Sequence, residues 1–166
     1  MRAPEDGIPI SRVTSQTIAE LLPLIRAYLD FYEKQPPDAD VRVLCEALAA
    51  DPENEGVQLL ARTADGAAVG FATIFWSWST TAATRIGTMN DLFVTESARG
   101  SGVADALIEA CLEECRSRGA HSLEWRTAKD NFRAQAVYDR MGGERSEWLD
   151  FSLAVRAPRG EIGSIQ

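Results

Sequence analysis

The feature that most constrains this chain is a glycine-rich turn between an apolar strand and an amphipathic helix. Residues 85–95 end in the β-branched and aromatic content of a buried strand, and residues 102–118 carry apolar side chains at helical spacing. The turn between them reads Arg99-Gly100-Ser101-Gly102-Val103-Ala104. Its main-chain N–H groups can converge on an anion at the positive end of the helix, because glycines let the backbone approach closely and Arg99 adds a cation. The turn predicts a site for a pyrophosphate.

A G-x-G turn is common by itself, so its ligand has to be judged from the rest of the chain. The sequence contains neither G-x-G-x-x-G with an acidic residue downstream nor G-x-x-x-x-G-K-[ST]. These are the signatures of dinucleotide and nucleoside-triphosphate sites, so both classes of ligand are disfavoured. A different phosphate-bearing ligand is expected.

The turn resembles the central signature of the GNAT superfamily of N-acetyltransferases, [QR]-x-x-G-x-[GA], which opens a helix directly after a buried strand. Further along, the family's N-x-x-A-x-x-x-Y segment resembles Asn131, Ala134 and Tyr138, which stand ahead of Gly142. The resemblance covers residues 91–153 and extends, from the order of elements, back to residue 8. It implies an enzyme that moves an acetyl group from acetyl-CoA to a primary amine.

The order of expected elements agrees with this resemblance. Pro23 is expected to interrupt or kink the first helix, since proline lacks the N–H that a helix needs. The fold class is α/β in the order β-α-α-β-β-β-α-β-α-β, with a mixed, mostly antiparallel sheet and helices on both faces. We expect a single domain over residues 1–166 with its core at about 8–155, built from strands at 8–13, 57–62, 68–77, 85–95, 122–127 and 146–155 and helices at 18–29, 41–50, 102–118 and 131–141.

The resemblance implies that two parts of the chain bind acetyl-CoA. The strand residues Leu92, Phe93 and Val94 splay from their neighbour and pair with the pantetheine arm, while residues 99–104 take the pyrophosphate. Asn131 contacts the cofactor, caps its helix, or does both.

Tyr138 stands where the family's tyrosine protonates the departing thiolate. A phenol with a pKa of about 10 can donate to a thiolate whose pKa is about 8.5. Its alternative role is packing on a helix face with Val137 and Met141. Direct transfer is favoured over an acetyl-enzyme, because Cys111 and Cys115 fall on an apolar helical stripe.

The acceptor side most resembles the diamine and thialysine acetyltransferase branch of the superfamily. This resemblance rests on Phe75, the run at 91–94, Glu124-Trp125 and Trp148, but the branch's acidic residue before the aspartate is Asn90 here, and its Trp-Asn pair is Asp130-Asn131. A small cationic acceptor is implied: a diamine, a polyamine or an amino-acid side chain. The expected substrate-binding residues are Glu33, Asn90, Asp91, Glu124 and Trp148.

A base must take the proton of the attacking amine, since an alkylamine has a pKa of about 10.4 and only its neutral form attacks. Asn90 cannot accept it. Asp91 is the first candidate, and a water chain linked to Glu33 or Glu124 is the alternative.

The net charge of −8 disfavours nucleic acid and anionic membranes as partners and favours a cationic substrate, although acidity also serves solubility. The chain lacks a run of 18 apolar residues and a signal-peptide pattern, so a cytoplasmic location is expected. Three cysteines without a C-x-x-C pair predict reduced thiols and no metal site.

Other functions remain open from the sequence. The same fold acetylates protein lysines, peptide N-termini or aminoglycosides, and a non-catalytic acetyl-CoA-binding protein is a further alternative. Resemblance to small GNAT enzymes implies a homodimer.

Overall fold

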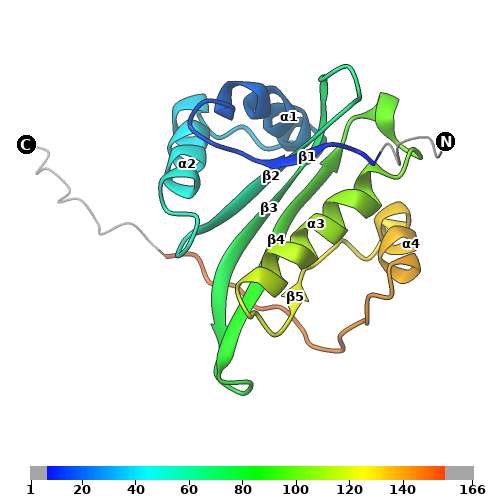
Figure 1. The fold of residues 1–166 in the computed structure, drawn as a ribbon. Helices are drawn as coiled ribbons and strands as arrows, with labels where there is room; N and C mark the ends of the chain where they lie inside the picture. Colours follow the sequence, from blue (N-terminus) through cyan, green and yellow to red (C-terminus); the bar gives the residue numbers. More distant parts are fainter. Residues whose placement is uncertain (1–6, 156–166) are drawn as a thin grey trace, which may run out of the picture.

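The chain builds a sheet with helices on both of its faces (Figure 1). The computed structural model describes residues 7–155. In chain order its elements are β1 (Ile10–Arg12), α1 (Ile18–Phe31), α2 (Asp38–Ala50), β2 (Gly56–Arg62), β3 (Ala68–Ser79), β4 (Thr84–Val94), the short 3₁₀ helix η1 (Glu96–Ala98), α3 (Val103–Ser117), β5 (Leu123–Glu124) and α4 (Phe132–Arg140). The strands lie in the order β1-β2-β3-β4-β5, antiparallel except for the parallel pair β4 and β5. The predicted fold class, a mixed and mostly antiparallel α/β sheet, is confirmed.

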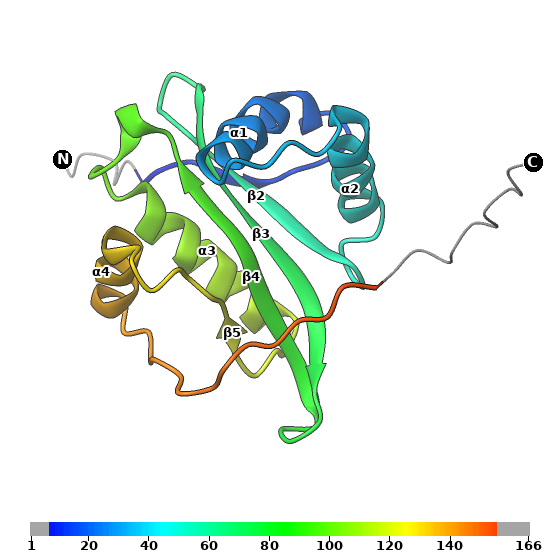
Figure 2. The same cartoon turned by 180° about the vertical axis from the view of Figure 1, so that it is seen from behind.

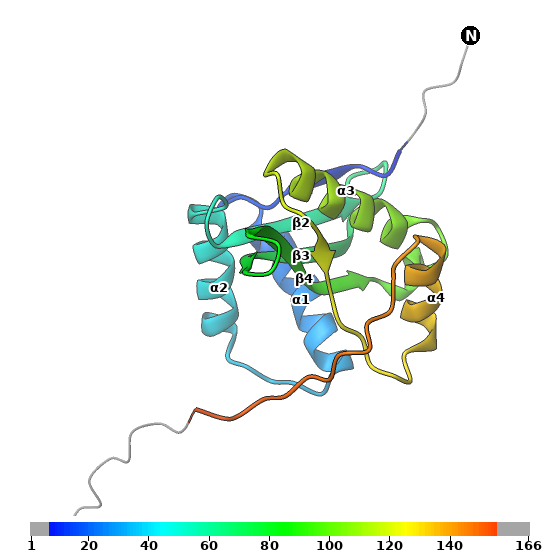
Figure 3. The ribbon, with the colours of Figure 1, turned by 90° about the horizontal axis from the view of Figure 1, so that it is seen from below.

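Different helices cover the two faces of the central strands (Figures 2 and 3). α3 lies on one face, where Leu107 and Ile74 belong to one buried cluster. α1 and α2 lie on the other, where Leu21, Cys45 and Phe71 belong to a second cluster. Successive residues of a strand point to opposite faces, so a strand covered on both sides needs apolar residues at consecutive positions. This explains the nearly continuous apolar sequence of β3.

Of the two effects predicted for Pro23, interruption or a kink of the first helix, interruption is wrong. α1 runs through Pro23 from Ile18 to Phe31. Proline removes the hydrogen bond to the carbonyl four residues earlier, and that residue, Ala19, is exposed, as is Pro23. Water can satisfy the carbonyl, so the helix continues.

The prediction of a last strand over residues 146–155 is also wrong, and β5 is shorter than the predicted 122–127. Residues 146–155 form no strand, and the large apolar side chains among them are exposed: Trp148, Leu149, Phe151, Leu153 and Val155. Alternation of apolar residues matches a strand, but a strand also needs a partner with which to exchange hydrogen bonds. β5, with two residues, offers little edge for pairing.

Residues 1–6 and 156–166 lie outside the described part of the chain. Both ends of the predicted domain, residues 1 and 166, therefore fall outside it. Among residues 7–155, no helix has both the length and the apolar character needed to cross a bilayer.

Candidate functional site

A bulge in β4 separates this strand from β5. Thr73 of β3 pairs with Asp91 and Ile74 pairs with Met89, so Asn90 is an extra residue that pairs with neither. On its other side, β4 pairs with β5 only at Gly87 and Thr88. Within residues 7–155 the β5 side of residues 89–94 therefore has no partner strand. An extended ligand can pair with this free edge as an added strand.

The glycine-rich turn follows at the end of the same strand. Gly100 and Gly102 have φ values of 78° and 86°, a left-handed conformation that side chains other than glycine adopt with strain. None of the main-chain N–H groups of residues 100–105 donates to another described residue. A Cβ at Gly102 would meet only the Cδ1 of Ile8, at 3.9 Å. The turn therefore presents several unpaired N–H donors to open space at the N-terminus of α3, which is the arrangement that binds a phosphate.

Arg99 is fixed beside this turn. Its Nε donates to the carbonyl oxygen of Val94 at 3.2 Å, and its side chain is exposed. The bond ties the guanidinium to the end of β4 while leaving further N–H donors for an anion.

A small cleft of about 60 Å³ lies where β4 and β5 diverge. Four of the residues predicted for the site line it: Asn90, Leu92, Asn131 and Tyr138. The sequence predicted no binding or catalytic role for the other residues of its wall, although Trp125 and Ala134 belong to the motifs that carry the family resemblance. These other residues are Tyr28, Tyr32, Met89, Trp125, Arg126, Thr127 and Ala134. The spacing of Tyr28 and Tyr32, four residues apart in a helical segment, was a signal that both face the same side.

Tyr138 of α4 is half-buried at the edge of this cleft. Its ring lies 5.2 Å from that of Trp125, centre to centre. Burial, and secondarily the neighbouring Tyr32, raise the pKa of Tyr138 above its ordinary value. The phenol therefore keeps its proton at neutral pH and can donate it.

Asn131 begins α4. Its Oδ1 accepts a hydrogen bond from the N–H of Ala134 at 3.2 Å, so the capping role is confirmed. The amide nitrogen of Asn131 remains a donor on the wall of the cleft.

Asp91 lies on the opposite face of β4 from Leu92. Phe93 packs with the cluster under α1 and α2, and Asp91, two residues earlier, shares its face. Its Oδ1 accepts from the amide of Asn90 at 3.0 Å. Burial, and then the Asp91 carboxylate nearby, raise the pKa of Tyr28. The Asp91 carboxylate and Tyr28 thus lie close to each other, and Tyr138 lies on the other side of the bulge.

Tyr28 is held in place by other aromatic rings. Its ring centre lies 5.0 Å from that of Tyr32, 5.8 Å from Phe71 and 6.2 Å from Phe93. Edge-to-face contacts of this kind fix the side chain's direction.

Four predicted substrate residues do not line the cleft: Asp91, which lies on the other face of β4, and Glu33, Glu124 and Trp148. Glu33 follows α1 with a φ of 54° and is exposed. Glu124 is exposed and accepts from the hydroxyl of Ser122 at 2.9 Å. Trp148, in the segment that forms no strand, is 93% exposed.

The cysteines are core residues, as the stripe predicts. Cys111 and Cys115 are buried under the sheet. Burial raises the pKa of Cys115 to about 11 and that of Cys111 further, so both stay protonated and are poor nucleophiles. Within residues 7–155, no three His, Cys, Asp or Glu side chains are grouped closely enough to hold a metal ion.

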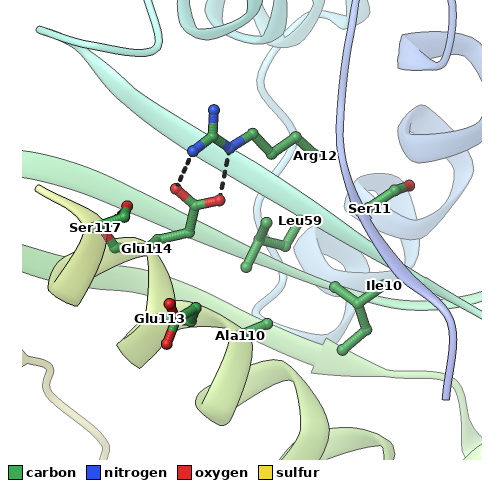
Figure 4. A pocket seen from close by; sticks show the side chains of 8 residues that line it. All are labelled: Ile10, Ser11, Arg12, Leu59, Ala110, Glu113, Glu114 and Ser117. Atoms are coloured by element: carbon green, nitrogen blue, oxygen red, sulfur yellow. Dashed lines mark hydrogen bonds and ion pairs between the residues drawn. The ribbon is translucent and has the colours of Figure 1, made fainter. Parts of the chain in front are cut away.

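A larger pocket, of about 390 Å³, lies between β1 and α3 (Figure 4). Its Glu114 carboxylate accepts two hydrogen bonds from Arg12, at 2.6 and 2.7 Å, and a third from Arg118 at 2.9 Å. The pocket includes neither the glycine turn nor β4. Its charged groups are paired with one another, so the smaller cleft is the candidate site.

Residues 21–143 match the model of the acetyltransferase (GNAT) family. The uncharacterized N-acetyltransferase YhfO of Bacillus subtilis (strain 168) is 28% identical over 149 residues, which cover 89% of this chain and 98% of that protein. The D-amino-acid N-acetyltransferase HPA3 of Saccharomyces cerevisiae is 35% identical over 79 residues, or 48% of this chain and 49% of HPA3.

Solved structures share the fold. The crystal structure of a probable acetyltransferase matches with a TM-score of 0.79 at 27% identity, covering 91% of this chain and 100% of the other. AAC(6')-Iy, in complex with a bisubstrate analogue, CoA-S-monomethyl-acetylneamine, matches with a TM-score of 0.73 at 21% identity, again over 91% and 100%. At that identity the second match concerns the fold alone.

Proposed function

From the premise that this chain belongs to the acetyltransferase (GNAT) family and is an acetyl-CoA-dependent N-acetyltransferase, we propose that it acetylates the primary amine of a small cationic acceptor by direct transfer. The observation that carries the proposal is that the groups suited to acetyl-CoA and the groups suited to an amine acceptor lie next to each other. The free edge of β4 lines the cleft and leads at its end to the turn with its unpaired N–H groups, and the Asp91 carboxylate lies beside Tyr28 on the other face of β4.

The cofactor half fits acetyl-CoA, which supplies the acetyl group as a thioester. The N–H groups of residues 100–105 and the guanidinium of Arg99 hold the pyrophosphate, where a Cβ at Gly102 would intrude. The main chain of residues 92–94 aligns the pantetheine arm and donates to the carbonyl oxygen, which stabilises the charge that develops there. Positioning of the two reactants supplies much of the acceleration.

Protons move through two groups on opposite sides of the bulge. Asp91 receives the proton of the attacking amine, because it is partly buried beside Asn90 and Tyr28, which line the cleft, whereas Glu33 and Glu124, the alternatives, are exposed. Tyr138 donates to the departing thiolate, since its raised pKa keeps it protonated.

A cationic acceptor is favoured by the aromatic faces that line the cleft and by the Asp91 carboxylate next to two of its lining residues, Asn90 and Tyr28. Tyr28, Tyr32 and Trp125 line it, and an ammonium group is attracted to the faces of such rings. Asp91 adds the negative charge. We place a diamine first, in keeping with the resemblance to the diamine branch.

An amino acid is the second candidate acceptor. Arg126 lines the cleft and can bind a carboxylate, although here it pairs with Asp150 at 2.9 Å. The partial likeness to a D-amino-acid N-acetyltransferase supports this choice.

The test is release of free thiol from acetyl-CoA in the presence of a panel of amines. The panel holds a diamine, a monoamine of equal length, D- and L-amino acids, an aminoglycoside and a peptide, with a reaction lacking amine as the control. We expect the diamine to give the highest kcat/KM. A clear preference for neutral or peptide acceptors contradicts the cationic proposal.

A further inference from the structure

Only two polar side chains are fully buried among the described residues. They are Gln58 of β2, which is 3% exposed, and Thr73 of β3, which is 0% exposed. Burying a polar group destabilises the fold unless its hydrogen bonds are replaced. The position of such residues in an otherwise apolar core can therefore indicate a role other than packing.

Both residues belong to one row across the sheet. Gln58 lies opposite Thr73, and Thr73 lies opposite Asp91. The Nε2 of Gln58 donates to the Oγ1 of Thr73 at 3.3 Å. We call Gln58 and Thr73 the polar row; it ends at the carboxylate proposed to receive the amine's proton.

The hydrogen bonds of the polar row have a direction. Because the Thr73 oxygen accepts from Gln58, its own hydrogen remains to be donated. Residues directly opposite in an antiparallel pair have Cβ atoms about 5 Å apart, so Thr73 and Asp91 are neighbours on one face of the sheet, although no direct hydrogen bond joins them in the described part of the chain. The side-chain amide of Asn90 also donates to Asp91, at 3.0 Å.

The polar row also lowers the stability of the fold, and packing gives no reason for this loss. The Oε1 of Gln58 is buried and accepts no hydrogen bond from any described residue. An apolar pair of the same shape would avoid this loss. Residues that lower stability in this way are typical of functional positions.

We propose that Gln58 and Thr73 are positioning residues that fix the direction of the Asp91 carboxylate through the Thr73 hydroxyl. The inference rests on the proposed role of Asp91. A carboxylate whose side chain is held from two sides keeps the orientation needed to accept a proton, as supporting hydrogen bonds do at other sites.

The test compares Thr73→Val, which removes the hydroxyl at nearly constant shape, with Thr73→Ser, which keeps it. For Thr73→Val we expect kcat to fall about tenfold or more with the KM for acetyl-CoA unchanged, and the melting temperature to fall as well, because the buried Nε2 of Gln58 loses its acceptor. Thr73→Ser should retain most of the turnover. The matched control is Thr88→Val in β4, which lies off the row and should leave kcat unchanged.

A double-mutant cycle then asks whether Thr73 acts through Asp91. In the Asp91→Asn background, Thr73→Val should change kcat no further. Full activity of Thr73→Val, or equal losses of kcat and melting temperature in the Val and Ser variants, overturns the positioning role.

Failure of the proposed function is separable from failure of this inference. The cycle uses whichever amine the wild-type enzyme acetylates best, so a non-cationic acceptor refutes the substrate proposal alone. An effect of Thr73→Val that persists undiminished in the Asp91→Asn variant refutes the polar row alone.

Discussion

The two halves of the proposed site, the turn for acetyl-CoA and the cleft side for the acceptor, are built in different ways. The cofactor half consists of main-chain groups from one continuous stretch, residues 99–104, whose shape follows from two glycines with positive φ. The acceptor half consists of side chains from α1 and β4, more than fifty residues apart, that meet only through packing. The cofactor half should therefore respond to backbone changes and the acceptor half to single functional groups.

The largest effect is expected in the cofactor half. Gly102→Val should weaken acetyl-CoA binding by about a hundredfold or more, measured by calorimetry, because the side chain enters the space before the N–H groups and strains the positive φ. Gly119→Val is the matched control. Gly119 has a φ of +63° and an open Cβ direction just past the other end of α3.

Both glycine variants should lose a comparable amount of stability, about 1–2 kcal/mol from the left-handed conformation. Only Gly102→Val should lose binding. Equal affinities in two folded variants would mean that the turn does not bind the pyrophosphate.

The next largest effect is expected in the acceptor half. Asp91→Asn should lower kcat by about 10²-fold or more while leaving the affinity for acetyl-CoA unchanged, since only the proton acceptor is lost. Glu33→Gln and Glu124→Gln test the water-chain alternative in the same steady-state assay. If either of these lowers kcat as much as Asp91→Asn does, the assignment of the base is wrong.

Tyr138 belongs to both halves, and a smaller effect is expected from it. Tyr138→Phe should reduce turnover more than about tenfold at nearly wild-type acetyl-CoA affinity. Because burial raises the pKa of Tyr138, the wild-type loss of kcat from deprotonation of the phenol should occur at a higher pH than an ordinary tyrosine would give. The pH profile of the Phe variant should lack that loss; an unchanged profile and full activity would leave Tyr138 a packing role.

The smallest effect is expected from salt. Raising ionic strength should increase the KM for a diamine by a few-fold, and much more than for a monoamine, because screening weakens the contact of the distal ammonium group. Asp91 and the aromatic walls are the groups concerned. Equal responses of the two substrates would show that the acceptor half is not selective for a second charge.

The contrast between the halves also explains which sequence predictions succeeded. The turn at 99–104, the capping role of Asn131 and the core cysteines were predicted because each depends on neighbouring residues or on a simple period. Tyr28 and Trp125 were given no role because their place in the cleft depends on how α1 and the segment after β5 approach β4.

The sequence by itself determined the helices, the first four strands and the geometry of the turn, because backbone preferences are set by each residue and its near neighbours. Only the tertiary structure decided the bulge at Asn90 and the absence of a strand at 146–155. Both depend on pairing between strands, and a pairing register is fixed by partners distant in the chain. The acceptor half also depends on the tertiary structure. Tyr28 meets Asp91 only when α1 packs on the face of β4 that the strand register selects.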